Sequence, residues 1–277
     1  MSIATDIKRA YRHGGTLTRL ILINVGIFVA YSAVRVVLYL SGHPVGHAYA
    51  RMLAVPADAH QLLLRPWTAV SYMFFHEEVL HIAFNMLWLY WFGQIFMQGH
   101  TPQQLRGVYL LGGLSGAVLF VLAYNLLPAF NPHGAMALGA SAAAMAVMFA
   151  CASRWPNQPI GLLLVGTVRL KHLALALVII DVASIPLSNA GGHIAHLGGA
   201  LYGLAFTGLL RRGHDISRPL AKLRHQRTPI APNHAPPRRP AHEQRIDRIL
   251  DKISRSGYDS LSTAEKAALF KNKGGSA

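Results

Sequence analysis

Charged residues are scarce in this sequence. Asp, Glu, Lys and Arg make up 13% of its 277 residues, whereas soluble globular domains contain about 25%. Hydrophobic residues make up 52% of the chain, and its long apolar runs all lie before residue 212. These proportions exclude a soluble globular fold for most of the chain. They predict an all-α integral membrane protein followed by a polar, basic tail.

Acidic residues and cysteine are fewer still. The chain has 11 acidic and 26 basic residues, which gives a formal net charge of +15. The basic residues lie near the N-terminus, between apolar runs and in the tail, and the tail shows no interleaved aromatic residues or nucleic-acid motif. We therefore expect them to set the membrane topology and contact anionic lipid, not nucleic acid. Cys151 is the only cysteine, which excludes an intramolecular disulfide.

Six apolar segments approach the length of about 20 residues that a helix needs to cross the bilayer core. They are residues 18–40, 79–98, 106–127, 136–153, 172–188 and 194–211. The first segment follows a basic stretch, as a signal peptide would, but it is long and further segments follow it. We interpret it as an uncleaved span, and the six segments together predict a six-helix membrane bundle.

The distribution of positive charge predicts that both termini lie in the cytoplasm. Basic residues precede the first segment, follow the sixth, and occur in the links after the second segment (Arg106) and after the fourth. The links 128–135 and 189–193 contain no Lys or Arg. The long link 41–78 is the exception among the outer links. We expect it to lie in the outer interface, anchored by Arg65 and Trp67.

Four polar residues are predicted to lie at one depth in this bundle. His81 and Asn85 fall in the first two turns of the second segment, Ser141 in the second turn of the fourth and His196 in the first turn of the sixth. At a rise of 1.5 Å per residue, all four lie within about 10 Å of the outer boundary. A serine in a membrane helix usually bonds its own backbone, but histidine and asparagine are costly there and indicate function.

These residue types suit nucleophilic catalysis, because histidine is the usual base that activates a serine hydroxyl. Ser141 is expected near a helix N-terminus, where unpaired N–H groups favour negative charge. Its own N–H and the His81 and Asn85 side chains can therefore stabilise an oxyanion. Small residues around Ser141, and the pair Gly199 and Gly203, would let the fourth and sixth segments approach closely.

The same residues resemble the motifs of rhomboid intramembrane proteases. His81-Ile82-Ala83-Phe84-Asn85 resembles the HxxxN element of their second span, and Gly139-Ala140-Ser141-Ala142 resembles their GxSG nucleophile motif. Ala195-His196-Leu197-Gly198-Gly199, followed by Gly203, resembles their histidine motif, and Trp67 resembles the tryptophan of their first-loop WR element. The resemblance covers residues 16–212, with the motifs in the family's order.

The resemblance implies a six-span rhomboid-like bundle that cleaves the transmembrane segments of single-span membrane proteins. Ser141 would be the nucleophile, His196 its general base and acid, and His81, Asn85 and the Ser141 N–H the oxyanion hole. These enzymes use a serine–histidine dyad with no required acid, no metal and no cofactor. The supporting residues would be Gly139, Gly199, Gly203, Trp67, His193 and Met145.

His193 is the alternative to His196 as the base. Glycines follow His196 at the third and seventh positions, as the family pattern requires, whereas His193 has His196 and Ala200 there. We therefore assign the role to His196 and expect His193 to support the site or face water.

Three residues depart from the family pattern. Ala142 replaces the second glycine of GxSG, Thr68 replaces the WR arginine, and Met145 stands where family members often have an aromatic residue. Alanine is still small, and methionine can contact a ring through its sulfur, so we expect the dyad to be retained. His76 aligns with another family histidine and is expected to be structural.

Three regions are predicted along the chain: a membrane protease domain at 1–212, a proline- and arginine-rich linker at 213–240, and a small cytoplasmic helical hairpin at 241–277. Ser262 and Glu265 form a capping-box pattern within the hairpin. The hairpin resembles a short tail on some rhomboids from Bacteroidetes-type bacteria. The expected location is a bacterial inner (plasma) membrane.

Two other functions are compatible with parts of the sequence. A non-catalytic rhomboid-like protein would bind membrane clients, but such proteins lose the serine or the histidine, and this chain has both. A transporter would line its pathway with Asp181 and the histidines, but no inverted repeat is visible. The natural substrate, its cleavage site and the oligomeric state stay open.

Overall fold

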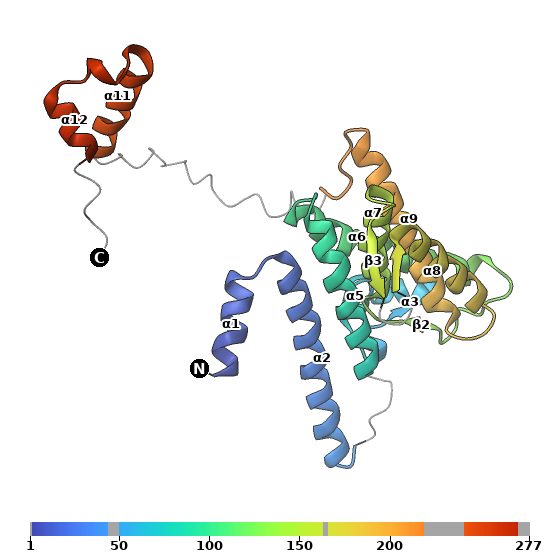
Figure 1. Cartoon of the computed structure of the whole chain (residues 1–277). Coiled ribbons are helices and arrows are strands. Elements are labelled where there is room, and N and C mark those ends of the chain that lie inside the picture. The colour runs from blue at the N-terminus through green and yellow to red at the C-terminus, as the bar shows by residue number, and fades with distance from the viewer. Residues whose placement is uncertain (1, 44–49, 163–165, 219–240, 271–277) are drawn as a thin grey trace. The chain divides into compact units, whose positions relative to one another are not determined.

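A computed structural model of the chain describes residues 2–43, 50–162, 166–218 and 241–270 (Figure 1). It divides into two compact units, Met1–His225 and Gln226–Ala277. Most of the predicted linker at 213–240 lies outside the described residues.

The first unit is mostly helical. Its helices are α1 (Ile3–His13), α2 (Thr16–Leu40), α3 (Ala59–Leu64), α4 (Thr68–Ser71), α5 (Val79–Met97), α6 (Pro102–Leu126), α7 (Ser141–Arg154), α8 (Leu170–Ser184) and α9 (Ala190–Arg211), with the 3-10 turns η1 (Ala50–Met52) and η2 (Tyr72–Phe74). Two small antiparallel hairpins pair β1 (Val55–Pro56) with β2 (Met136–Ala137) and β3 (Pro159–Leu162) with β4 (Gly166–Arg169).

Four of the described helices, α2, α5, α6 and α9, are long and apolar enough to cross a membrane. Helices α7 and α8 correspond to the fourth and fifth predicted spans, but they have only 14 and 15 residues. At 1.5 Å per residue they are about 21–23 Å long, shorter than a bilayer core of about 30 Å. The structure therefore does not confirm the predicted count of six spans.

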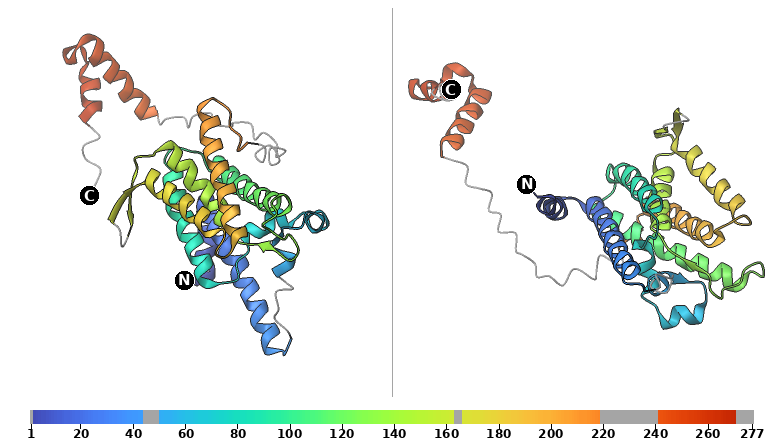
Figure 2. Two further views of the ribbon diagram at one scale, coloured as in Figure 1. Left: turned by 90° about the vertical axis from the view of Figure 1, so that its right-hand side faces the viewer. Right: turned by 90° about the horizontal axis from the view of Figure 1, so that it is seen from below.

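Helix α7 is the central helix of the first unit. Every residue from Ala142 to Ala152 is buried, and α5, α6 and α9 all pack against it. Figures 1 and 2 show α2 and α8 on opposite sides of this unit. The outward side chains of α2, such as Val29 and Val37, are more than half exposed, as expected for a surface that faces lipid.

Glycines bring α7 and α9 into backbone contact. A Cβ atom on Gly199 would lie 2.0 Å from the carbonyl oxygen of Ala142, and one on Gly203 would lie 2.3 Å from that of Ala146. Any side chain at either position would force the helices apart. The predicted close approach of these two segments is therefore confirmed.

The beginning of the fourth segment differs from the prediction. Residues Met136–Ala137 are not helical, because they pair with Val55–Pro56 as strand β2. Gly139 has a φ of +118°, which no right-handed helix accommodates. Ser141 is consequently the first residue of α7, not a residue of its second turn.

Two other helices begin earlier than predicted. Helix α6 begins at Pro102, where Thr101 and Gln104 form a reciprocal capping box, so Arg106 lies within the helix and not in a link. Helix α9 begins at Ala190, so His196 lies in its second turn and not its first. The outer link expected at 189–193 is therefore mostly helical, and Gly191 lies against the buried ring of Phe120.

The segment before α5 consists of short turns tied together by side chains. The Trp67 Nε1–H donates to the carbonyl oxygen of Met52 at 2.9 Å, and Arg65 Nη1 donates to that of Arg51 at 2.7 Å. Ser71 donates to the carbonyl oxygen of Leu53 at 2.8 Å. These bonds fix the approach to His76, which is fully buried.

The second unit contains α11 (Ala241–Ser256), the 3-10 turn η3 (Tyr258–Ser260) and α12 (Thr263–Phe270). Gly257 follows α11 with a φ of +75°. Ser262 and Glu265 hydrogen-bond to each other's backbone N–H groups at 2.8 and 3.3 Å, which completes the expected capping box at the start of α12. Lys252 Nζ lies 2.9 Å from Glu265 Oε2 and connects the two helices.

Candidate active site

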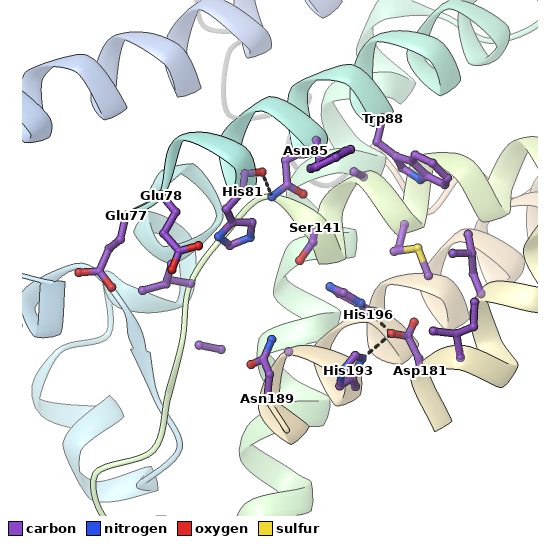
Figure 3. A pocket seen from close by; sticks show the side chains of 18 of the residues that line it. Glu77, Glu78, His81, Asn85, Trp88, Ser141, Asp181, Asn189, His193 and His196 are labelled. Carbon is purple, nitrogen blue, oxygen red and sulfur yellow. Dashed lines mark hydrogen bonds and ion pairs between the residues drawn. The ribbon is translucent and has the colours of Figure 1, made fainter. Parts of the chain in front are cut away.

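A cavity of about 800 Å³ opens into the first unit where α5, α7, α8 and α9 meet (Figure 3). Its lining includes six residues that can take part in proton transfer or hydrogen bonding and that lie on these four helices: His81, Asn85, Ser141, Asp181, His193 and His196. Five of these six were predicted from the sequence as site residues, and Asp181 was not. Polar groups from four helices thus converge on one space.

The backbone before Ser141 is held by two hydrogen bonds that it donates to η2 and to the turn that follows η2. The Gly139 N–H donates to the carbonyl oxygen of Tyr72 at 2.9 Å, and the Ala140 N–H donates to His76 Nε2 at 3.2 Å. Burial lowers the pKa of His76 to about 4, so its ring is neutral near pH 7 and Nε2 can accept this bond. The structural role of His76 is therefore to hold the backbone at Ala140, immediately before Ser141.

His81 and Asn85 lie on the face of α5 that borders the start of α7. The Asn85 side-chain amide donates to the His81 carbonyl oxygen at 3.0 Å, and both side chains line the cavity. A Cβ atom on Gly139 would lie 2.8 Å from the His81 ring. The absence of a side chain at Gly139 therefore lets His81 reach the turn that presents Ser141.

Asp181, on α8, binds both histidines of α9 through a single oxygen atom. Its Oδ1 lies 2.8 Å from His193 Nδ1 and 2.9 Å from His196 Nδ1. The Asp181 residue is only 5% exposed. The sequence offered one signal for this arrangement, which was an acidic residue inside an apolar segment; the pairing with α9 depends on tertiary packing.

The His196 ring lies between Ser141 and Asp181 (Figure 3). Because Nδ1 faces Asp181, the other ring nitrogen, Nε2, is left for the serine side. Among the described residues, no hydrogen bond joins the Ser141 hydroxyl to His196. Catalytic hydrogen bonds are often long without substrate and shorten in the reacting complex.

The same three side chains have the donor set of a metal site. The ligand atoms of Asp181, His193 and His196 all lie within 4.8 Å of one another. One carboxylate and two imidazoles are typical of zinc sites. Their hydrogen bonds to each other satisfy the same atoms without an ion.

Two of the predicted supporting residues, Met145 and Trp67, lie in different surroundings. Met145 is 5% exposed and lines the cavity, whereas Trp67 is half exposed and lies outside the cavity lining. Ala142, which replaces a glycine of the family motif, packs against α6 at a glycine: a Cβ on Gly116 would lie 2.6 Å from the Ala142 Cβ. The extra methyl group therefore occupies space that Gly116 leaves open.

Comparison with known families supports the assignment made from the motifs. The family described as "Rhomboid domain" matches residues 64–213, which is more than half of the chain. The chain belongs to the rhomboid family. This rhomboid is accordingly an integral membrane protein whose environment is a lipid bilayer. Residues 237–272 match a second family, whose function is unknown.

Several curated rhomboids are similar to this chain. Presenilin-associated rhomboid-like protein A, mitochondrial, from Danio rerio is 28% identical over 59% of this chain and 43% of its own length. RHOMBOID-like protein 12, mitochondrial, from Arabidopsis thaliana is 30% identical over 53% and 47%. Rhomboid protease GlpG from Pectobacterium atrosepticum is 26% identical over 46% and 51%. This rhomboid therefore spans about half of the length of the relatives that it matches.

Proposed function

We propose that this rhomboid is an intramembrane serine endopeptidase that cleaves the transmembrane segments of single-span membrane proteins with a Ser141–His196 dyad. The observation that carries the proposal is the position of Ser141. It begins α7 on the wall of the cavity, and the His196 ring lies on the side of Ser141 that faces Asp181 (Figure 3). The similarity to Rhomboid protease GlpG supports the same activity.

In the proposed reaction, the Ser141 Oγ attacks the carbonyl carbon of the scissile peptide bond while its proton passes to His196 Nε2. The tetrahedral intermediate then collapses, the C–N bond breaks, and Nε2 returns the proton to the leaving amine. Water hydrolyses the resulting ester on Ser141 by the same proton transfers. No metal or cofactor takes part in this scheme.

We assign the oxyanion hole to the Ser141 N–H and to the His81 and Asn85 side chains. As the first residue of α7, Ser141 has a backbone N–H without an intrahelical acceptor, and the helix dipole favours negative charge there. His81 lies against Gly139, two residues before Ser141. Asn85 already uses one amide N–H as a donor, toward the His81 carbonyl oxygen, and its second N–H would donate to the oxyanion.

The substrate is proposed to enter sideways, between α5 and α8. The cavity walls there are apolar, with Phe84 and Trp88 on α5 and Leu177 and Ile180 on α8. Helix α8 is short and is followed by Pro186. A transmembrane segment that used this route would keep its apolar side chains away from water.

We further propose that all six helices α2 and α5–α9 cross the bilayer, with both termini in the cytoplasm of a bacterium and the domain in its inner (plasma) membrane. The distribution of Lys and Arg supports this orientation. Helix α7 can be short because protein surrounds it, and non-helical backbone is tolerated at membrane depth where it is buried or lines a cavity. Residues 1–212 would form the protease domain, 213–240 a linker and 241–277 a cytoplasmic hairpin.

The test is cleavage of labelled single-span proteins by the purified rhomboid in liposomes, compared with Ser141→Ala. We expect cut fragments from the unsubstituted protein and none from Ser141→Ala, with equal thermal stability for both. Binding of the same segments without cleavage by either protein would favour a client-binding role. If neither binding nor cleavage occurs across a panel of such segments, the proposal is wrong.

A further inference from the structure

We infer that Asp181 is a positioning residue for the proposed reaction: it orients His196 toward Ser141 and stabilises the ring when it accepts the serine proton. The inference rests on the proposed serine protease function. It goes beyond that function because the rhomboid resemblance implies a dyad without an acid. The observations behind it are one shared oxygen atom, its burial, and the order of the three residues in space.

The hydrogen bond determines which nitrogen of His196 can act as the base. A carboxylate can only accept hydrogen bonds, so His196 Nδ1, 2.9 Å from Asp181 Oδ1, must carry a proton. In the neutral ring, Nε2 is then unprotonated. The ring lies between Asp181 and Ser141 (Figure 3), so the nitrogen that can accept a proton is the one left for the serine.

The two histidine rings account for the burial of the carboxylate. Among the described residues, the rings of His193 and His196 are the only groups that bond the Asp181 side chain. An acidic residue within a membrane segment costs several kcal/mol unless it is paired. When His196 becomes an imidazolium during the reaction, this buried carboxylate lies in direct contact with the new positive charge.

A purely structural role is the competing explanation, because the two hydrogen bonds also connect α8 to α9. His193 allows the two roles to be separated. It donates to the same oxygen from the preceding turn of α9, at 2.8 Å. The hydrogen bond of His193 connects α8 to α9 just as that of His196 does. The family pattern, however, assigns the role of the base to His196. The catalytic effect of Asp181 should therefore depend on His196 and not on His193.

The experiment measures kcat and KM of full-length Asp181→Asn in liposomes, in the presence of EDTA so that no metal ion joins the three side chains. We expect kcat to fall about 10²- to 10⁴-fold, the range that a well-placed general base contributes, while KM and the melting temperature stay close to those of the unsubstituted protein. Asp181→Ala should lose activity similarly and regain part of it with added formate, but not with chloride. Asp6→Asn, the same substitution at an exposed acid of α1 outside the cavity lining, is the matched control and should keep its activity.

Double substitutions identify the residue through which Asp181 acts. Asp181→Asn should reduce kcat by the same factor in a His193→Ala background, and should cause no further loss in a His196→Ala background, because members of one catalytic unit are non-additive. A fall in melting temperature without formate rescue would overturn the inference in favour of a structural role. Full activity of Asp181→Asn, alongside an inactive Ser141→Ala, would overturn the inference alone. Activity that survives in Ser141→Ala would instead overturn the proposed function.

Discussion

Ser141 owes its position to the residues immediately before it. Gly139 takes a backbone conformation with φ of +118°, and Ala140 donates its N–H to the buried ring of His76. The chain therefore turns sharply and starts α7 at the serine itself. This arrangement exposes the hydroxyl to the cavity and leaves the serine N–H free for a ligand.

The proposed oxyanion hole gives a prediction at the scale of single residues. Asn85→Ala should lower kcat roughly 10- to 1,000-fold without abolishing turnover, because one lost oxyanion donor typically costs about 2.7–4 kcal/mol at the upper end of this range. His81→Ala should have an equal or larger effect, because its ring also fills the space beside Gly139. Both are measured as kcat on a labelled transmembrane substrate.

Phe84→Ala serves as the control for these two variants, because it also lines the cavity from α5 but has no polar group. Its effect should fall mainly on KM. If Asn85→Ala and His81→Ala both turn over at the unsubstituted rate, neither side chain belongs to the oxyanion hole.

The sequence predicted most of the candidate site at this scale. Ser141, His196, His81 and Asn85 carry local spacing patterns, and the structure brings all four to one cavity. The bond from Asp181 to His196 could not be predicted, because it depends on how α8 packs against α9. The contact between Ala142 and Gly116 could not be predicted from the sequence either, because it joins residues of two different helices.

At the scale of helices and strands, the apolar runs predicted where each principal helix lies but not where it begins. The fourth segment starts later than its hydropathy suggests, because Met136–Ala137 pairs with Val55–Pro56 across 80 residues of sequence. The residues around Met136 contain no sequence pattern that indicates the pairing of β1 with β2. Helix α9 starts earlier than expected, at Ala190, and Gly191 packs on Phe120 where the sequence indicated an outer link.

The proposed lateral route leads to a prediction about α5 and α8. A crosslink between Trp88→Cys on α5 and Leu177→Cys on α8, in a Cys151→Ala background, should abolish cleavage of a transmembrane substrate. Both positions line the cavity, so the link would close the proposed route of the substrate. Hydrolysis of a small soluble ester should continue, because water and the ester reach Ser141 from the aqueous side.

Each single-cysteine variant, treated with the same crosslinker, is the control for chemical modification alone. When the crosslinker is reducible, its reduction should restore cleavage. Unchanged cleavage of the transmembrane substrate in the fully crosslinked protein would refute entry between these two helices.

For the whole molecule, composition and hydropathy were sufficient to predict an integral membrane protein, and the order of motifs was sufficient to predict the family, which residues 64–213 match. The number of spans was harder to predict, because α7 and α8 are shorter than the bilayer core is thick. Helix α7 does not need the usual length or a lipid-compatible surface, since other helices enclose it. Apolar run length alone does not reveal such an enclosed helix.

The central claim is that Ser141 is the nucleophile, and covalent labelling tests it most directly. The full-length rhomboid in liposomes would be treated with a serine-reactive fluorophosphonate, digested and mapped by mass spectrometry. We predict one labelled serine, Ser141, with no labelling in Ser141→Ala and labelling at least about 100-fold slower in His196→Ala, as expected when the general base is removed. Labelling that persists in Ser141→Ala, or that maps to another serine in the unsubstituted protein, would contradict the account.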